Sequence, residues 1–197
     1  MSWNARYDTP EYVFGTAPSQ VLERHAARLI PGQSALAVAD GEGRNSVFLA
    51  ERGMRVTAFD GAENALLKAR ALAGSRGVEV RYDEADILTY DWDAAQYDLV
   101  VAIFIQFLTP EERGPVFEGL LRATRPGGLI LLHGYGLDQL AHGTGGPREA
   151  SQLYTEDMLR KAFAGREILE LRSYEAVLEE GPGHSGPSAL VDLLLRA

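Results

Sequence analysis

Residues 35–60 decide the fold, and they read Ala-Leu-Ala-Val-Ala-Asp-Gly-Glu-Gly-Arg-Asn-Ser-Val-Phe-Leu-Ala-Glu-Arg-Gly-Met-Arg-Val-Thr-Ala-Phe-Asp. An apolar strand, a glycine turn, a helix and a second strand ending in an acid follow one another. This order is typical of the opening of a doubly wound α/β sheet. Gly41 and Gly43 allow the backbone to turn sharply and to approach a ligand closely. Asp60 ends the second strand, where a carboxylate can accept hydrogen bonds from a ribose diol.

The residues after the glycines indicate which nucleoside ligand fits. A dinucleotide site has a third glycine or alanine three residues after the second glycine, to seat a pyrophosphate at the helix start. Arg44, Asn45 and Ser46 follow Gly43 here. The loop therefore favours an adenosine carried without a pyrophosphate and disfavours a nicotinamide-dependent oxidoreductase.

Length and composition limit the class of protein. The chain has 197 residues, enough for one well-buried α/β domain and too few for two ordinary ones. We expect a single domain over 1–197, with a lid and first helix at 1–30, a cofactor-binding core at 34–133, and a substrate-side loop, helix and hairpin at 134–197. The net charge of −9 offers no basic patch for nucleic acid, so the expected partner is a small molecule. We expect a monomer or a homodimer.

Other compositional features concern the compartment. The chain has no cysteine, which excludes disulfides and thiolate chemistry. No apolar run is long enough to span a membrane, and the N-terminal residues lack the pattern of a secretory signal. The sequence therefore predicts a cytoplasmic protein that does not contact membranes.

Apolar runs and breakers predict an alternation of helices and strands. The predicted helices are residues 20–29 (with Ser19 as the cap), 44–52, 63–73, 110–125 and 155–164. The predicted strands are 35–39, 55–59, 78–82, 97–104, 129–133, 167–177 and 188–195. The last two form a terminal antiparallel hairpin. The fold class is therefore a doubly wound, seven-stranded, mostly parallel, Rossmann-like α/β sheet with a C-terminal antiparallel hairpin.

This pattern resembles the class I S-adenosylmethionine (SAM) methyltransferases. Gly-Glu-Gly-Arg-Asn-Ser at 41–46 and Leu-Ala-Glu-Arg-Gly at 49–53 look like the tellurite-resistance and thiopurine-methyltransferase-like branch. Trp-Asn-Ala-Arg-Tyr at 3–7 and Glu-Gly-Pro-Gly-His-Ser-Gly at 180–186 are similar to a bacterial subgroup of it. The resemblance implies methyl transfer from SAM to a small thiol, metalloid oxyanion, amine or oxygen acceptor, with S-adenosylhomocysteine (SAH) as the product.

The resemblance also implies roles for single residues. The glycine loop lies against the methionine half of SAM, Asp60 binds the ribose, Asp86 contacts the adenine amino group beside Ile87, and the end of strand 97–104 lines the methyl-transfer centre. The implied cofactor-binding residues are Asp40, Gly41, Gly43, Arg44, Asn45, Asp60, Gly61, Asp86, Ile87, Ile103 and Gln106. Two readings stay open at several of them. Asp86 can instead cap a turn, and Arg44 and Asn45 can either hold the cofactor carboxylate or serve only as helix-capping and surface residues.

The loop departs from the family pattern at two positions. Ala37 stands where an acid commonly helps to organise the methionine end of the cofactor, and Ala39 stands where the first glycine does. Asp40 can supply the carboxylate from a different angle. These departures keep an alternative open, a non-catalytic SAM- or nucleoside-binding protein of the same fold.

The candidate catalytic residues are His133, Tyr7 and His184. An alcohol or amine acceptor can need a base, whereas a thiolate or a tellurium oxyanion needs none. Tyr7 belongs to an aromatic N-terminal segment that can close over the cationic sulfonium. His25 is expected on the surface or in packing, and His142 in a loop at 134–147. Glu180 and His184 alone fall short of a metal site, so no metal is expected.

Overall fold

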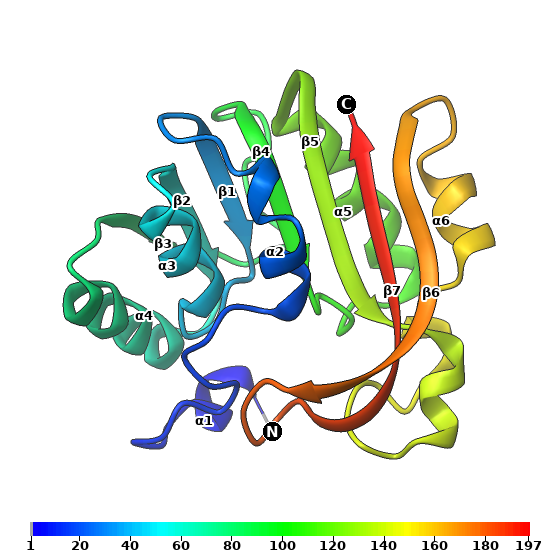
Figure 1. Ribbon diagram of the computed structural model, residues 1–197, viewed down its shortest axis with the longest axis horizontal. Coiled ribbons are helices and arrows are strands. Elements are labelled where there is room, and N and C mark those ends of the chain that lie inside the picture. Colours follow the sequence, from blue (N-terminus) through cyan, green and yellow to red (C-terminus); the bar gives the residue numbers. More distant parts are fainter. Residues whose placement is uncertain (1) are drawn as a thin grey trace. The chain divides into compact units, whose positions relative to one another are not determined.

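The chain, described over residues 2–197 by a computed structural model, contains a seven-stranded sheet of order β3-β2-β1-β4-β5-β7-β6 (Figure 1). β1 pairs with β2, β2 with β3 and β4 with β5 in parallel, whereas β7 is antiparallel to both β5 and β6. This topology confirms the predicted fold class. The chain forms two compact units, Met1–Tyr90 with Glu180–Gly183 and Asp91–Glu179 with His184–Ala197. The predicted single domain with three parts stays a prediction.

The first unit contains the strands that carry the glycine loop. β1 is apolar and almost entirely buried, as expected of a parallel strand covered on both faces. Val38 pairs with Phe59, and Asp60 pairs with Glu84, so the carboxyl ends of these strands meet at one edge. The elements are α1 (Trp3–Arg6), α2 (Gln20–Arg24), a 3₁₀ helix (Ala26–Arg28), β1 (Ser34–Val38), α3 (Arg44–Glu51), β2 (Arg55–Asp60), α4 (Glu63–Arg76) and β3 (Val80–Glu84).

The second unit is built on four strands, with the C-terminal strand β7 between β5 and β6 (Figure 1). Thr109 caps α5, because its side chain accepts the Glu112 amide while the Glu112 carboxylate accepts the Thr109 amide. The elements are β4 (Tyr97–Ile103), α5 (Pro110–Arg122), β5 (Thr124–Tyr135), 3₁₀ helices (Leu137–Ala141 and Ala150–Gln152), α6 (Glu156–Ala162), β6 (Glu167–Glu179) and β7 (Ser185–Arg196).

The helix predicted at 20–29 is shorter than expected. α2 ends at Arg24 and a single 3₁₀ turn follows it. Ser19 occupies the N-cap position but its side chain does not cap the helix; its hydroxyl donates to Glu180 instead, 3.0 Å away. A long-range acceptor has therefore replaced the local capping bond that the sequence predicted.

Other boundaries moved at glycines and prolines. The helix predicted at 110–125 ends at Arg122, and β5 begins at Thr124, before the Pro-Gly-Gly turn. Residues 125–128 bulge out of the β4–β5 ladder, because Tyr97 pairs with Thr124 and Leu99 with Leu129. β3 runs over Val80–Glu84 rather than 78–82. α4 passes through Gly74 and ends at Arg76, and the C-cap residue Gly77 has φ 66°.

Part of the segment predicted as a loop at 134–147 has regular secondary structure. β5 extends to Tyr135, and the 3₁₀ helix Leu137–Ala141 follows it. Gln139 anchors this segment, since its side chain accepts the Ala189 amide at 2.8 Å and donates to Thr144.

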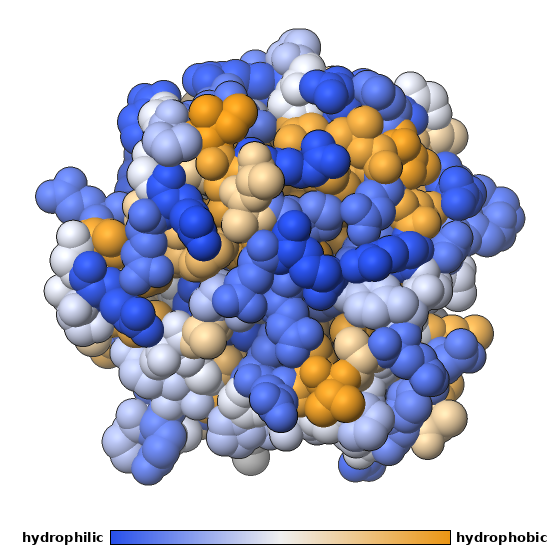
Figure 2. Space-filling view, in the orientation of Figure 1, coloured by the Kyte–Doolittle hydropathy of each residue, from blue (hydrophilic) through white to orange (hydrophobic). Residues whose placement is uncertain are grey.

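Hydrophilic residues cover much of the face shown in Figure 2, with apolar residues in separate groups between them. Exposed large apolar side chains are scattered along the described chain and include Ile30, Leu67, Leu88, Leu140 and Val177. Among the described residues, no helix combines the length and the apolar character needed to cross a membrane.

Candidate functional site

The loop between β1 and α3 has a left-handed residue at three alternate positions. Ala39, Gly41 and Gly43 have φ of 47°, 62° and 88°. Ala39 thus adopts the conformation that a glycine would supply at this position, at a steric cost of about 1–2 kcal/mol. A Cβ on Gly43 would lie 2.7 Å from the Ala69 Cβ, so α3 can begin here only with glycine. The turn therefore survives the replacement of the first glycine by alanine.

Asp60 closes this loop from the neighbouring strand. One carboxylate oxygen accepts the Gly41 amide at 2.8 Å and the other accepts the Ala62 amide at 2.9 Å. Burial raises the pKa of Asp60, although the amides that donate to it act in the opposite direction. Gly61, which follows it, is exposed. The side chain predicted to bind a ribose is thus fixed in place by the loop that it would serve.

Asp40 is the acid that the sequence offered in place of Ala37. Its carboxylate accepts both the hydroxyl and the amide of Ser46, and the Ser46 hydroxyl lies 3.1 Å from that of Tyr82. Burial raises the pKa of Asp40 to about 7. Asp40 therefore changes charge near neutral pH, in a position directly before the first loop glycine.

Arg44 and Asn45 are neither surface residues nor free to bind a ligand by themselves. The Arg44 guanidinium forms a buried ion pair with Glu180 at 2.7 Å, and the Asn45 side-chain oxygen accepts the Ser19 amide at 2.9 Å. Glu180 also accepts the Gln20 amide at 2.9 Å. These residues fasten α3 to α2 and to the hairpin turn within the first unit. Their capping-and-surface interpretation is therefore wrong.

Glu42 was missed by the sequence reasoning. It is only 3% exposed, and its carboxylate accepts the amides of Val13 and Phe14 at 3.1 and 3.2 Å. Lys68 completes the set with an ion pair of 2.8 Å. The sequence signal that could have revealed Glu42 was an acid between two loop glycines. Glu42 holds the N-terminal segment against the loop.

Tyr7 lies over the loop, as the lid interpretation requires. It is buried against Ala62 and Ala65, and a Cβ on Gly41 would lie 2.9 Å from its hydroxyl oxygen. Burial, and then the nearby Asp60 carboxylate, raise the pKa of Tyr7 far above its ordinary value. The phenol therefore keeps its proton near neutral pH, which suits a hydrogen-bond donor better than a base.

The remaining candidates of the first unit follow β3. Asp86 is exposed and its side chain accepts the Leu88 amide at 2.8 Å, which is the turn-capping role that the sequence left open. Ile87 is buried. The contact of Asp86 with adenine stays a prediction.

In the second unit, Ile103 and Gln106 lie at and just beyond the end of β4. Ile103 is buried and pairs with His133 across the parallel ladder. The Gln106 amide bonds to both the amide and the carbonyl of Tyr135 and also donates to the Gln152 carbonyl. Gln106 therefore holds the end of β5, and its place in a cofactor site stays a prediction.

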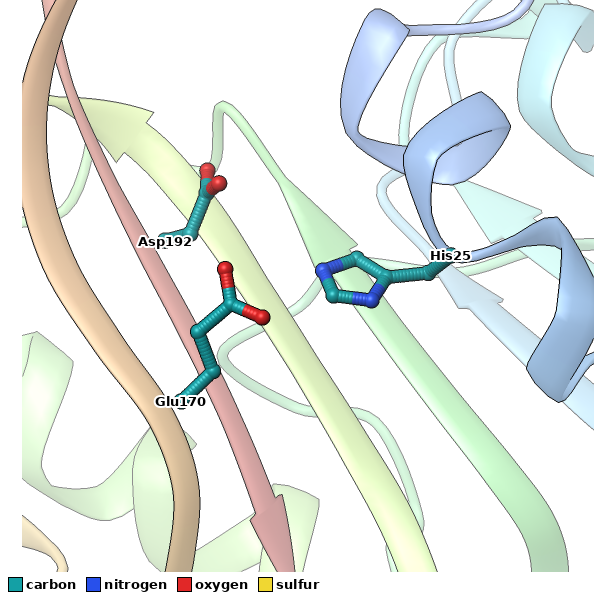
Figure 3. Close-up of side chains that lie close together, drawn as sticks. All are labelled: His25, Glu170 and Asp192. Atoms are coloured by element: carbon teal, nitrogen blue, oxygen red, sulfur yellow. The ribbon is translucent and has the colours of Figure 1, made fainter.

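His133 forms a buried pair with Asp192, a residue that the sequence reasoning did not select. Its Nδ1 lies 2.6 Å from the Asp192 carboxylate, and the two side chains are 1% and 0% exposed. Tyr174 donates to Asp192 at 3.1 Å and Arg172 pairs with it at 3.2 Å. Figure 3 shows the Asp192 and Glu170 side chains on β7 and β6. A single acid inside the apolar run 189–195 was the signal that could have revealed this network.

The other histidines take different roles. The His184 ring packs on Phe104 and Tyr135, with centroid distances of 4.1 and 5.7 Å. His25 is buried, which supports packing rather than surface exposure, and His142 pairs with Glu175 at 3.2 Å. The absence of a metal stays an expectation from the sequence.

The glycine loop, Asp60, Asp86 and β4 belong to a segment with known relatives. Residues 35–128 match a family described as a methyltransferase domain. An uncharacterised protein of Mycobacterium tuberculosis is 30% identical over 105 residues, 53% of this chain and 38% of that protein. Glycine/sarcosine N-methyltransferase of Parasynechococcus marenigrum is 27% identical over 153 residues, 76% of this chain and 51% of that protein. The chain thus spans about half or less of these relatives.

Solved structures resemble the chain over a longer range. One, from work on the conversion of a disulfide bond into a thioacetal group during echinomycin biosynthesis, has a TM-score of 0.78 at 21% identity and covers 98% of this chain and 89% of its own. TehB from Haemophilus influenzae has a TM-score of 0.73 at 21% identity, and the alignment covers 98% of this chain and 65% of TehB. The N-methyltransferase NodS from Bradyrhizobium japonicum, in complex with SAH, has a TM-score of 0.73 at 15% identity. The alignment covers 98% of this chain and 95% of NodS. The chain therefore has the fold of these proteins.

Proposed function

We propose that the chain is a SAM-dependent methyltransferase that methylates a small-molecule nucleophile and releases SAH. The match of residues 35–128 to a methyltransferase domain supports this proposal, as does the fold shared with an SAH complex. The observation that carries it is Asp60, a buried carboxylate clamped by Gly41 and Ala62 at the end of β2. A carboxylate there retains lone pairs for a ribose diol.

The loop residues fit such a cofactor. Gly41 and Gly43 leave the backbone bare where a nucleoside would approach, and a side chain on Gly41 would collide with Tyr7. Asp40 supplies a carboxylate near the site of the missing acid at Ala37, and Asp86, Gly61 and Ile87 border the adenine. Arg44 and Asn45 act indirectly by holding α3. When bound, SAM supplies an electrophilic methyl group on a good leaving group.

The protein then contributes mainly alignment and exclusion of water. Tyr7 covers the loop and offers an aromatic face to a cation. Ile103 and Gln106 border the methyl-transfer centre in this proposal. His133 and His184 are the remaining candidates for a base.

We further propose that the chain belongs to the tellurite-resistance and thiopurine-methyltransferase-like branch, which the likeness to TehB supports. The N-methyltransferases among its relatives and structural neighbours favour amines as a second class of acceptor. Thiols, metalloid oxyanions and small amines therefore form the first acceptor panel.

Calorimetric titration with SAM and SAH, and with NAD as the control ligand, tests the proposal. We expect saturable binding of the first two and none of NAD. Asp60→Asn should weaken both by about 10- to 100-fold, the value of a charge-assisted hydrogen bond of about 1.5–3 kcal/mol. Glu79→Gln, an exposed acid just before β3 at the opposite end of the strands, is the matched control and should bind as the wild type does.

Two outcomes would count against the proposal. Unchanged affinity in a folded Asp60→Asn variant would remove the ribose assignment. Tight binding of SAM without methyl transfer to any thiol, oxyanion or amine would favour the alternative, a binding protein of the same fold.

A further inference from the structure

Asp40 caps the helix that follows the glycine loop, although it lies outside that helix. Gly43 occupies the N-cap position of α3 and has no side chain, so the first amides of the helix need another acceptor. The Asp40 carboxylate accepts the Ser46 amide at 3.3 Å and also the Ser46 hydroxyl. A negative charge at a helix N-terminus is favourable. The charge of Asp40 therefore affects how the loop joins α3.

The Ser46 hydroxyl can serve either protonation state of Asp40. It has one proton to donate and two acceptors within reach, the Asp40 carboxylate and the Gly43 carbonyl at 3.1 Å. When Asp40 is ionised, Ser46 donates to it. When Asp40 is protonated, its own hydroxyl can donate to the Ser46 oxygen while Ser46 turns its proton to the Gly43 carbonyl. The Tyr82 hydroxyl, 3.1 Å away, can donate to Ser46 in both states. Both states thus keep their hydrogen bonds and differ by one charge.

The cationic side chains of this region are engaged with other acids. The Arg44 guanidinium pairs with Glu180 at 2.7 Å, and Lys68 pairs with Glu42 at 2.8 Å. Asp40 is held instead by the amide and the hydroxyl of one serine. A ligand that brings a positive charge to the loop would therefore act on a carboxyl group whose protonation state is not fixed by an ion pair with either of these two cations.

Several elements of the first unit contribute to the electrostatic surroundings of Asp40. The titratable and charged groups that act on it are Arg44 on α3, Asp60 on β2, Tyr82 on β3 and Tyr7 after α1. Burial raises the pKa of Asp40 to about 7, the hydrogen bonds from Ser46 oppose the rise, and the Asp60 carboxylate adds to it. This balance agrees with the two hydrogen-bonding states that Ser46 provides.

We infer that Asp40 and Ser46 form a proton-linked switch, so that SAM binding at the glycine loop releases the proton of Asp40 to solvent and the affinity for SAM rises with pH. This inference rests on the proposed function and uses only residues of the first unit. A positive charge bound at the loop stabilises the ionised carboxyl group, and by linkage the ionised carboxyl group stabilises the bound cation. Asp40 is a positioning residue, because it acts through its charge and its hold on α3.

The switch distinguishes the cofactor from its product. SAM and SAH carry the same α-amino and carboxylate groups, so they differ in charge only by the sulfonium. SAM should therefore release more of the Asp40 proton than SAH does, and the ratio of the two affinities should shift toward SAM as the pH rises. Replacement of SAH by fresh SAM is then easier above pH 7 than below it.

The first experiment is calorimetric titration with SAM and SAH in buffers of different ionisation enthalpy, which counts the protons released. For SAM we expect release of about 0.5–0.8 proton at pH 6.5 and close to none from Asp40 at pH 8.5, with a fall in Kd of about 5- to 10-fold between pH 6 and pH 8. Asp40→Asn should abolish this release. The α-amino group of SAM, with an ordinary pKa of about 8, titrates with wild type and variant alike. Glu79→Gln, the exposed acid before β3, is the matched control and should behave as the wild type does.

A second variant changes the switch without removing the acid. Ser46→Ala keeps the Asp40 carboxyl group but deletes a hydrogen bond that favours its ionised form. The pH at which SAM affinity levels off should therefore rise by about one pH unit. A purely structural role of Ser46 would lower SAM affinity equally at every pH.

The outcomes separate this inference from the proposed function. SAM binding with no proton release by the wild type at pH 6.5, or with equal release by Asp40→Asn, would overturn the inference, as would a larger release with SAH than with SAM. If Asp40→Asn does not fold, an unchanged pH profile in Ser46→Ala would overturn it. Absence of SAM binding at every pH would refute the proposed function and this inference with it.

Discussion

Asp40 is the residue at which the loop differs most in chemistry from the pattern it resembles. It is a half-buried acid, and the nearby Arg44 guanidinium is paired with Glu180. Its hydrogen bonds with Ser46 favour the ionised form, but burial outweighs them and raises the pKa of Asp40 to about 7. A cationic cofactor bound beside it would favour the carboxylate.

This shift predicts a pH-dependent stability. Because the native pKa of Asp40 lies above its value of 3.8 in the unfolded chain, the native state holds an extra proton between about pH 4 and pH 7. Stability is therefore lost as pH rises through that window, by about 4 kcal/mol at most for a shift of about three units. Asp40→Asn removes this loss. The free energy of unfolding of the variant should therefore rise relative to that of the wild type as the pH rises from 5 to 8.

Urea unfolding of both proteins over this pH range, without cofactor, makes the comparison. Asp93→Asn is a matched control for removing one carboxylate, because Asp93 is exposed in the turn before β4. A stability difference between wild type and Asp40→Asn that stays constant from pH 5 to pH 8 would contradict the native shift of Asp40.

At the scale of elements, the N-terminal segment depends on one side chain of the glycine loop. Glu42 accepts the amides of Val13 and Phe14, and Gly183 donates its amide to the Val13 carbonyl at 2.9 Å. The segment is thus tied both to the loop and to the hairpin turn of the first unit. Removing its anchor should loosen it without touching the sheet.

Glu42→Gln should lower the free energy of unfolding by about 2–3 kcal/mol, because it removes the charge that pairs with Lys68 and one buried acceptor. Hydrogen exchange of the Val13 and Phe14 amides should accelerate, and SAM affinity should fall. Asp157→Asn, which breaks the exposed pair with Lys161, is the control and should change stability by about 0.5 kcal/mol or less. Unchanged exchange at both amides would show that the anchor lies elsewhere.

The sequence predicted the elements better than their long-range contacts. β1, α3, β2 and the terminal hairpin were found because local period and glycine turns determine them. α2 begins where the sequence predicted, but it ends at Arg24 and a 3₁₀ turn follows it. The capping role of Ser19 was mispredicted because its hydroxyl bonds to Glu180, which lies 161 positions away along the chain. Glu42 and Asp192 were overlooked for the same reason, since their partners lie on other elements. His133 was selected by its strand-end position, but its pairing required the register of β7.

At the scale of the molecule, the order of elements was sufficient to predict the doubly wound sheet and its reversed last strand. Parallel strands need crossover helices, and a chain of this length with seven strands leaves few right-handed arrangements. The division into two units was not anticipated. It puts the residues proposed to bind SAM, other than Ile103 and Gln106, in the first unit and the His133–Asp192 pair in the second.

This division predicts where a bound cofactor slows hydrogen exchange. If Asp60 and the glycine loop bind the adenosine, SAH should protect the amides of residues 39–46, 58–63 and 84–88, because these are the backbone groups that the ligand covers or rigidifies. At 100 times its Kd, SAH should add about 2.7 kcal/mol of stability, equivalent to a rise in Tm of about 5–10 °C for a chain of this size. Peptides from β6 and β7, apart from the turn that packs on the N-terminal segment, should show only the general slowing that this added stability gives to exchange through global unfolding, and NAD should protect neither unit. Protection centred on β6 and β7 would place the nucleoside in the second unit and leave Asp60 as a purely structural clamp of the loop.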